Sequence, residues 1–246
     1  APALSAPVML GLGLLVAGGV YFVSRQRVIK QEHAATENRL MSLRMQLNPH
    51  FIFNALTAIQ NYILSGKDVK QATRYLSNFA RVMRAFLEYN QEEHISLEKE
   101  IGALELYIGM QKMRFQNGFE HTVDLDPEID PEEILVPPML IQPFVENSVE
   151  HGLRNVDNGQ LTLAYKLIGE ELEMKVIDNG LGRKNSTASE AQKRFKKQSL
   201  ATKITQERID LLNSQLKSKR AYRFDISDLY ADGTGTVVTF TIPLIT

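Results

Sequence analysis

Residues 161–182 read LTLAYKLIGEELEMKVIDNGLG. Apolar and polar side chains alternate over Leu161–Leu167 and again over Leu172–Ile177, which is the pattern of two half-buried strands. A Gly-Glu pair separates the two runs, where a tight turn is expected. The segment therefore predicts a β-hairpin whose second strand ends in an acidic residue, Asp178, followed by two closely spaced glycines.

The flanking sequence adds further strands and helices to this hairpin. Downstream, a helix is predicted from about Leu200 to Leu216, and strands over Tyr222–Tyr230 and Thr236–Leu244 surround an Asp-Gly turn signal. Upstream, the pattern begins with a short strand near Val123 and a helix from Pro137 to His151. We predict an α+β fold in which a mixed sheet carries helices over one face, an α/β two-layer sandwich.

Amphipathic helices precede this region. Apolar residues recur at helical spacing in two adjoining stripes from about Val28 to Leu64, and a second helix is expected from about Asp68 to Glu88. The two should form an antiparallel hairpin. Because one helix cannot cover so broad an apolar face, a homodimeric bundle is expected. A third helix, with Ser96 as its N-cap, leads away to about Phe115. The expected inner side of the second helix consists of Ala72, Tyr75, Leu76, Phe79, Val82, Met83 and Phe86.

The first residues have the character of a membrane span. Residues 1–24 contain no Asp, Glu, Lys, Arg or His, and Leu4–Val23 provides 20 mostly apolar residues, the length of a spanning helix. Basic residues follow at once, so the positive-inside rule places the remainder in the cytoplasm. A secretory signal peptide, the alternative, carries its charges before the apolar run. We therefore divide the chain into a transmembrane segment (1–24), a helical dimerisation region (25–117) and a C-terminal domain (118–246).

The composition excludes several classes of function. The 28 Lys and Arg residues oppose 29 Asp and Glu residues, a formal net charge of −1, so no nucleic-acid partner is expected. The chain has no cysteine. This excludes a disulfide framework, a thiolate metal cluster and a thiol nucleophile, and it fits a reducing compartment.

Residues 47–54 read LNPHFIFN and place a histidine inside the first long helix. Pro49 removes a helical N–H and should bend the helix where the imidazole of His50 projects. Asn54 lies four residues after His50 on the same face. It could accept the proton of one ring nitrogen and leave the other as a free lone pair, which suits a nucleophilic histidine. The alternative is a tolerated kink with a hydrogen-bonded bundle histidine.

The predicted helix 137–151 ends in a polar cluster of Glu146, Asn147, Glu150 and His151. Amide and carboxylate oxygens suit Mg²⁺, which bridges phosphates. Glu146 or Glu150 could also orient or deprotonate a group during phosphoryl transfer. A solvated surface is the alternative for Glu150.

Asp178 and the glycines that follow it suggest a pocket for a nucleotide base. A buried Asp accepts hydrogen bonds from an exocyclic amine such as that of adenine, and Gly180 and Gly182 allow the backbone to approach a planar base closely. Asn179-Gly180 is also a hairpin-turn signal, which is the alternative. The polar, Lys- and Arg-rich residues 183–198 come next, either as a cationic loop that folds over phosphates or as solvated surface.

Taken together in this order, the motifs resemble a bacterial sensor histidine kinase of the LytS-like class. Residues 47–54 are similar to its phosphoacceptor box, 142–152 (QPFVENSVEHG) to its N box and 178–182 (DNGLG) to its first glycine box. The resemblance extends from about Leu40 to the end of the chain. It implies a dimerising helical hairpin followed by an ATP-binding sandwich of the GHKL (Bergerat) type, as in gyrase and Hsp90.

The resemblance also implies an activity and a set of site residues. His50 would accept the γ-phosphoryl group of ATP and pass it to an aspartate on a response regulator. Asn147 would hold Mg²⁺, and Asp178 would bind the adenine amine. The protein would lie in the bacterial inner (plasma) membrane with its catalytic region in the cytoplasm. The nucleotide contacts implied are Asn147, His151, Asp178, Gly180, Gly182 and Lys203.

The chain departs from this family in two places. Most sensor kinases carry an acid directly after the histidine, whereas this chain has Phe51, so Glu146 is the candidate base. The second glycine box corresponds to residues 198–204, QSLATKI, which contain no glycine. A helix starting there, with Ser199 as N-cap, would still offer N–H groups to phosphates.

Two rival functions stay open. One is a non-catalytic, nucleotide-binding dimeric signalling scaffold, which the glycine-free box favours. The other is a gyrase-like ATPase acting on another protein, which leaves residues 48–54 unexplained.

Overall fold

The computed structural model describes most of the second half of the chain and part of the first. Contacts divide the chain into two units, residues 1–42 and 43–246. The described residues of the first unit are helical. Of residues 188–200, only the backbone is described. The described residues are 19, 21–22, 24–26, 56–57, 59–60, 63–64, 69–115, 118–154, 156–182, 188–216 and 220–244.

Several predicted features therefore lie wholly or largely outside the described residues. They are the transmembrane segment 1–24, most of the helix 28–64 and, within that helix, His50 and Asn54. The described residues contain no helix with both the length and the apolar character that crossing a bilayer requires. The division into a membrane segment, a dimerisation region and a C-terminal domain stays a prediction.

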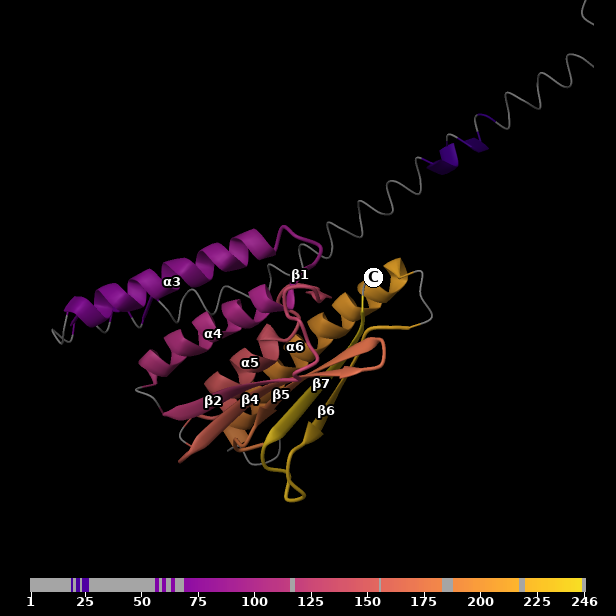
Figure 1. Cartoon of the computed structure of the whole chain (residues 1–246). Coiled ribbons are helices and arrows are strands. Elements are labelled where there is room, and N and C mark those ends of the chain that lie inside the picture. The colour runs from indigo at the N-terminus through magenta and orange to yellow at the C-terminus, as the bar shows by residue number, and fades with distance from the viewer. Residues whose placement is uncertain are drawn as a thin grey trace, which may run out of the picture. The chain divides into compact units, whose positions relative to one another are not determined.

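Helices α3 (Val69–Tyr89) and α4 (Leu97–Arg114) pack against each other (Figure 1). Both were expected, and Ser96 is the N-cap of α4, where its Oγ accepts from the backbone N–H of Lys99 at 3.4 Å. The inner side of α3 is buried at Tyr75, among others. Leu76 corrects the prediction for that side, because its side chain is 50% exposed. It lies about 100° around the helix from Tyr75 and so faces away.

The strands form two sheets. The larger has the order β2-β4-β5-β7-β6, with β2 parallel to β4 and the other neighbours antiparallel. Both predicted hairpins, β4–β5 and β6–β7, are present, and the parallel pair confirms a mixed sheet. The smaller sheet, an antiparallel pair of β1 (Ile95–Ser96) and β3 (Leu135–Val136), was not predicted. The strands of the larger sheet are β2 (Phe119–Leu125), β4 (Gly159–Ile168), β5 (Glu171–Asp178), β6 (Arg223–Asp228) and β7 (Thr236–Pro243).

Helices α4, α5 (Gln142–Asn147) and α6 (Ala188–Gln215) lie on one side of the larger sheet (Figure 1). Alternate residues of the central strands, such as Met174 and Phe240, point into the core between the layers and are buried. Phe144 anchors α5 to the sheet, with its ring centroid 5.5 Å from that of Phe240 in an edge-on arrangement. The predicted mixed α+β fold, a sheet with helices over one face, is confirmed.

Two predicted helix boundaries are wrong. Helix α6 begins at Ala188 rather than near Leu200, because residues 188–199 are rich in the strong helix formers Ala, Glu, Gln and Lys. Ser199 therefore lies inside a helix and does not cap one. The helix expected from Pro137 begins only at Gln142. The backbone of Met139 has a left-handed φ of 57°, which interrupts a right-handed helix.

Candidate functional site

Helix α5 continues into a single π-helical turn, η1 (Ser148–Gly152). The turn is closed by a hydrogen bond from the backbone N–H of Leu153 to the carbonyl oxygen of Ser148, at 2.8 Å. Such five-residue spacing is rare and is found mostly at functional sites. α5 and η1 together make up the 142–152 segment, which carries the predicted polar cluster.

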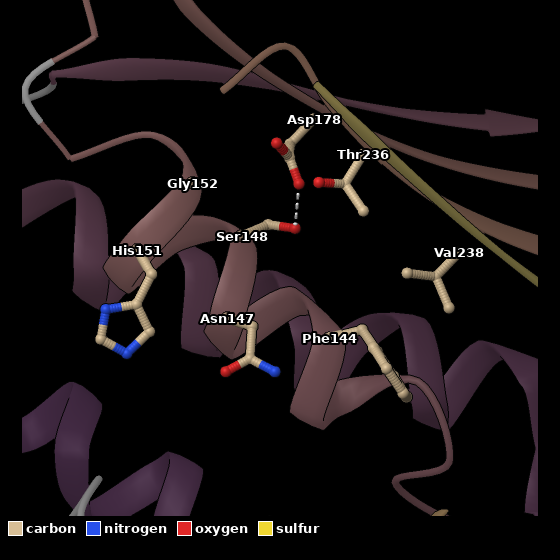
Figure 2. A pocket seen from close by; sticks show the side chains of 8 residues that line it. All are labelled: Phe144, Asn147, Ser148, His151, Gly152, Asp178, Thr236 and Val238. Atoms are coloured by element: carbon tan, nitrogen blue, oxygen red, sulfur yellow. Dashed lines mark hydrogen bonds between the residues drawn. The ribbon is translucent and has the colours of Figure 1, made fainter. Parts of the chain in front are cut away.

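A small cavity lies between the 142–152 segment, the end of β5 and the start of β7 (Figure 2). Three of the predicted nucleotide contacts, Asn147, His151 and Asp178, come together there. The cavity has a volume of about 20 Å³, which is room for roughly one water molecule. Its lining consists of Phe144, Asn147, Ser148, His151, Gly152, Asp178, Thr236 and Val238.

Asp178 is the last residue of β5, and its side chain is buried with 2% exposed. One carboxylate oxygen, Oδ2, accepts the hydroxyl proton of Ser148 at 2.6 Å. The other, Oδ1, accepts the backbone N–H of Gly180 at 3.0 Å. The two hydrogen bonds fix the orientation of a buried acceptor at the wall of the cavity.

The glycines after Asp178 allow backbone segments to pack against one another. A Cβ atom on Gly180 would overlap the carbonyl oxygen of Gly152, and one on Gly182 would overlap that of Gly233. Gly182 also has a left-handed φ of 70°. The close approach expected of these glycines is therefore made to protein backbone, and neither residue belongs to the cavity lining.

The hairpin-turn alternative for Asn179-Gly180 is wrong. The neighbours of β5 are β4 and β7, and the chain leaves the sheet after Asp178. Asn179 instead braces the adjacent strand: its Oδ1 accepts from the backbone N–H of Gln160 at 2.7 Å, and its Nδ2 donates to the carbonyl of Asn158 at 3.0 Å.

Asn147 fits a role toward a bound ligand. Its Nδ2 is buried and has no hydrogen-bond partner among the described residues, although it lines the cavity. Rotating the amide by 180° exchanges Nδ2 and Oδ1, so the side chain can present a donor or an oxygen ligand. The described residues contain no group of three or more His, Asp or Glu side chains suited to a metal ion. One protein oxygen is still compatible with Mg²⁺, which retains waters and binds phosphates.

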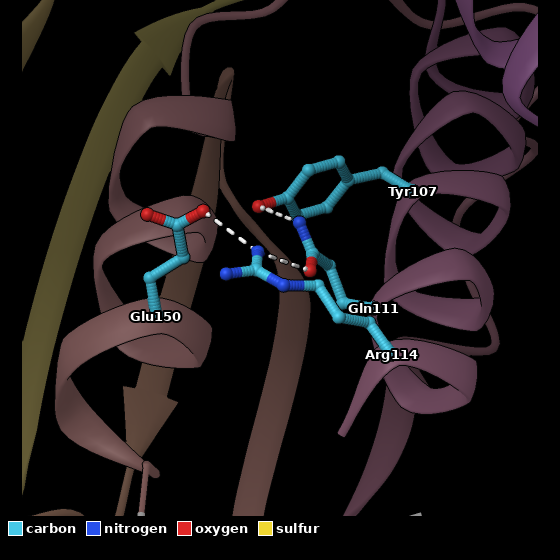
Figure 3. A network of polar contacts seen from close by, with 4 residues as sticks. All are labelled: Tyr107, Gln111, Arg114 and Glu150. Carbon is cyan, nitrogen blue, oxygen red and sulfur yellow. Dashed lines mark hydrogen bonds and ion pairs between the residues drawn. The ribbon is translucent and has the colours of Figure 1, made fainter. Parts of the chain in front are cut away.

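The two acidic residues of the 142–152 segment face away from the cavity. Glu146 and Glu150 are 6% and 4% exposed, and neither lines it. Glu150 pairs with Arg114 of α4 at 3.2 Å (Figure 3). Burial raises the pKa of Tyr107 well above its usual value, and the charges of Glu146 and Glu150 add to the effect. The solvated-surface alternative for Glu150 is therefore wrong.

The turn that leads into the 142–152 segment is held from two sides. The left-handed Met139 donates its N–H to Glu100 of α4 at 2.8 Å. Arg208 of α6 donates to the carbonyl oxygens of Met139 and Pro138 at 3.1 and 2.5 Å. Burial raises the pKa of Glu100 to about 7, against the opposing effects of these backbone N–H groups and of Arg208.

The remaining predicted contacts lie elsewhere or outside the described residues. Lys203 is exposed on α6 and does not line the cavity. His50 and Asn54 are not described, so their roles stay predictions. Ser199 offers no N-terminal amides to phosphates, since α6 starts at Ala188.

Sequence reasoning missed two polar residues of the cavity, Ser148 and Thr236. Ser148 follows Asn147 directly, and its hydroxyl is a plausible partner for a buried acid only once the fold is known. Thr236 lies opposite Asp178 in the β5–β7 register. The Gly-Thr-Gly-Thr run at 233–236 is a local signal of a close backbone approach that could have drawn attention to it.

The chain is similar in sequence to known histidine kinases. Residues 38–119 match the family model described as histidine kinase. The sensor histidine kinase YpdA of Escherichia coli K12 is 32% identical over 161 residues, and the sensor protein LytS of Oceanobacillus iheyensis is 29% identical over 173. The chain is therefore similar to sensor histidine kinases, LytS among them. The resemblance predicted from its three motifs is thereby confirmed.

The alignments cover most of this chain but less of its relatives. They span 65% of the chain and 27% of YpdA, and 70% of the chain and 28% of LytS. The protein YwpD of Bacillus subtilis is 33% identical over 169 residues, which cover 65% of the chain and 59% of YwpD. Among solved structures, the histidine kinase domain of the Erythrobacter litoralis EL346 blue-light activated kinase covers 87% of the chain, and 94% of that domain is covered, at 14% identity and a TM-score of 0.43.

Proposed function

We propose that the chain is the kinase portion of a membrane-anchored, homodimeric two-component sensor histidine kinase with a GHKL-type ATP site. It binds ATP at the Asp178 cavity, phosphorylates itself on His50 and passes the phosphoryl group to an aspartate of a response regulator. One observation supports this most strongly: Asn147, His151 and Asp178, which come from separate motifs, line a single cavity. The similarity to sensor histidine kinases supports the remaining steps.

The cavity suits the base of the nucleotide. The oriented carboxylate of Asp178 accepts the exocyclic amine of adenine, and Phe144 and Val238 offer apolar contact to the ring. A volume of about 20 Å³ is smaller than a purine. Binding therefore requires the lining to open, which makes nucleotide affinity sensitive to the position of the 142–152 segment.

The chemical step is a displacement at phosphorus. The unprotonated ring nitrogen of His50 attacks the γ-phosphorus, the bond to the β–γ bridging oxygen breaks, and ADP leaves with that electron pair. The proton on the other ring nitrogen, which Asn54 accepts in a hydrogen bond, is then lost to a base, for which Glu146 is the candidate. In the second step the ring takes a proton back on its other nitrogen, an aspartate oxygen of the regulator attacks the same phosphorus and the P–N bond breaks, which regenerates neutral His50.

Positioning and charge neutralisation dominate such a reaction. Asn147 is the residue that would hold Mg²⁺, which when bound neutralises charge on the phosphates. Lys203, exposed on α6, would approach the phosphates. The role of base stays with Glu146, which reaches the reaction only if the 142–152 segment reorients.

Incubation with γ-labelled ATP tests the proposal. We expect acid-labile, base-stable label on the chain, and no label on His50→Gln. His33→Gln is the matched control, because His33 lies in the same predicted helix, and it should label like the wild type. Labelling of His50→Gln at the wild-type rate would overturn the assignment.

A second candidate is a non-catalytic nucleotide-binding scaffold. It is favoured by the helical course of residues 198–204, which leaves no glycine loop and no helix start at the expected phosphate position. Tight Mg·ATP binding without any phosphohistidine would support this candidate over the kinase.

A further inference from the structure

Helix α4 presents a polar stripe to the 142–152 segment. Tyr107, Gln111 and Arg114 follow one another at helical spacing and point toward Glu150 (Figure 3). Gln111 donates from Nε2 to the Tyr107 hydroxyl at 3.0 Å, and its Oε1 accepts from Nη1 of Arg114 at 3.2 Å. The same Nη1 donates to Oε1 of Glu150 at 3.2 Å. The chain of hydrogen bonds therefore runs from the core of α4 to η1.

Contacts other than the ion pair with Glu150 also fix the orientation of the Arg114 side chain. Besides the bond to Gln111, its guanidinium carbon lies 4.8 Å from the ring centroid of Phe115. Gln111 itself is 1% exposed and Tyr107 is fully buried. The side chain of Arg114 is 24% exposed and that of Glu150 only 4%. An ion pair so placed is costly to break from one side, because the buried carboxylate would lose the positive charge of Arg114.

Glu150 lies at the middle of the π-helical turn. It immediately precedes His151 and follows Asn147 by three residues, and both of these line the cavity. The turn also contains Ser148, whose hydroxyl contacts Asp178 and whose carbonyl closes the turn. π-Helical turns are rare and occur mostly as single turns within or beside α-helices. The contact with Arg114 is therefore well placed to hold it.

We propose that Arg114 is a positioning residue for the nucleotide site: through Glu150 it holds the π-helical turn in the geometry that presents Asn147 and His151 to the cavity. The inference rests on the proposed nucleotide function of that cavity. Because Arg114 is on α4, which packs on α3, the contact also links the helical region to the site.

The test uses full-length variants and two readouts. Arg114→Met removes the charge, Arg114→Lys keeps it without the planar fork, and Glu150→Gln neutralises the partner. Lys112→Met is the matched control, since Lys112 is on the same helix but pairs at 3.0 Å with the exposed Glu120 of β2. The readouts are Mg·ADP affinity by calorimetry and hydrogen exchange of the Leu153 amide without nucleotide.

We expect Arg114→Met to weaken Mg·ADP binding about tenfold and to accelerate exchange at Leu153 to a similar degree. Arg114→Lys should be intermediate and Lys112→Met unchanged. Arg114→Met combined with Glu150→Gln should be no worse than Arg114→Met alone, because the two groups act as one unit. Additive losses, or unchanged Leu153 exchange in both Arg114 variants, would overturn the inference.

The two proposals fail in different ways. If the wild type binds no Mg·ADP, the proposed function fails, while the exchange arm still reports whether Arg114 holds the turn. If the wild type binds and the Arg114 variants bind equally well, the positioning role fails and the proposed function stands. Arg114→Lys keeps the test valid should far-UV circular dichroism show that Arg114→Met does not fold.

Discussion

The cavity face and the α4 face of the 142–152 segment are both polar, but they hold their polar groups differently. On the cavity face, Asn147 and Ser148 present neutral groups beside the oriented carboxylate of Asp178. On the α4 face, Glu146 and Glu150 are buried carboxylates next to helix side chains. The contrast indicates that one polar cluster in the sequence has two roles: one face lines the cavity where we propose that nucleotide binds, and the other contacts α4.

The largest effect should follow from replacing Arg208, which holds the turn that leads into the 142–152 segment and so supports both of its faces. Arg208→Met leaves the carbonyl oxygens of Pro138 and Met139 and the carboxylate of Glu100 without their buried cation. We expect the free energy of unfolding to fall by about 3–5 kcal/mol, measured by urea denaturation. Gln206→Ala, at an exposed position on the same helix, is the control. A loss no larger than that of the control would show that the turn does not need this anchor.

The cavity face is tested at its acid. Asp178→Asn should weaken Mg·ADP binding by about 100-fold, roughly 3 kcal/mol, because the amide cannot accept in place of both carboxylate oxygens. Stability should change by less than about 2 kcal/mol. Calorimetric titration measures the first and urea denaturation the second, with Asp225→Asn, exposed on β6, as control. Equal Mg·ADP affinities of the variant and the wild type would show that the nucleotide does not bind at this face.

The contact of Glu100 with the turn before the 142–152 segment should make the stability of the fold depend on pH. The pKa of Glu100 is raised from 4.5 to about 7 in the folded protein, so the folded state binds this proton more tightly than the unfolded state. The favourable contribution is complete below pH 4.5 and is lost as pH rises through 7, on the order of 3 kcal/mol in all. Glu100→Gln should remove this loss. We therefore expect the stability of the variant relative to the wild type to rise between pH 4.5 and 8 in urea titrations. A constant difference would contradict the assignment.

The smallest effect is expected at Ser148. Ser148→Ala removes one hydrogen bond to Asp178, at 2.6 Å, and leaves the backbone of the π turn intact. Mg·ADP affinity should fall by roughly five- to tenfold, about 1 kcal/mol. Exchange of the Leu153 amide should stay unchanged, in contrast to the Arg114 variants. If exchange of the Leu153 amide accelerates as well, the cavity face also holds the π turn, and the two faces do not have separate roles.

Local signals allowed much of the fold to be predicted from the sequence. The Gly-Glu and Asp-Gly turns gave correct hairpins, and Ser96 marked the start of α4, because these signals act within a few residues. Met139 and Leu76 were misjudged for the opposite reason. The left-handed backbone of Met139 depends on contacts with distant Glu100 and Arg208, and the exposure of Leu76 depends on how α4 packs.

The candidate site was predicted in part. Asn147, His151 and Asp178 were chosen from their motifs and meet at one cavity. Thr236 was missed because only the strand register brings it opposite Asp178. The burial of Glu150 could not be predicted, because its partner Arg114 belongs to α4 and is 36 residues away in sequence.

The central claim is that ATP bound at the Asp178 cavity donates the phosphoryl group that modifies His50. Mapping the phosphorylated residue by mass spectrometry at neutral pH, after incubation of the wild type and Asp178→Asn with Mg·ATP, tests it most directly. The account predicts phosphate on His50 in the wild type and about 100-fold less in the variant at subsaturating ATP, in proportion to the lost affinity. Equal phosphorylation of His50 in both proteins, or a wild type that binds nucleotide and carries no phosphate on His50, would contradict it.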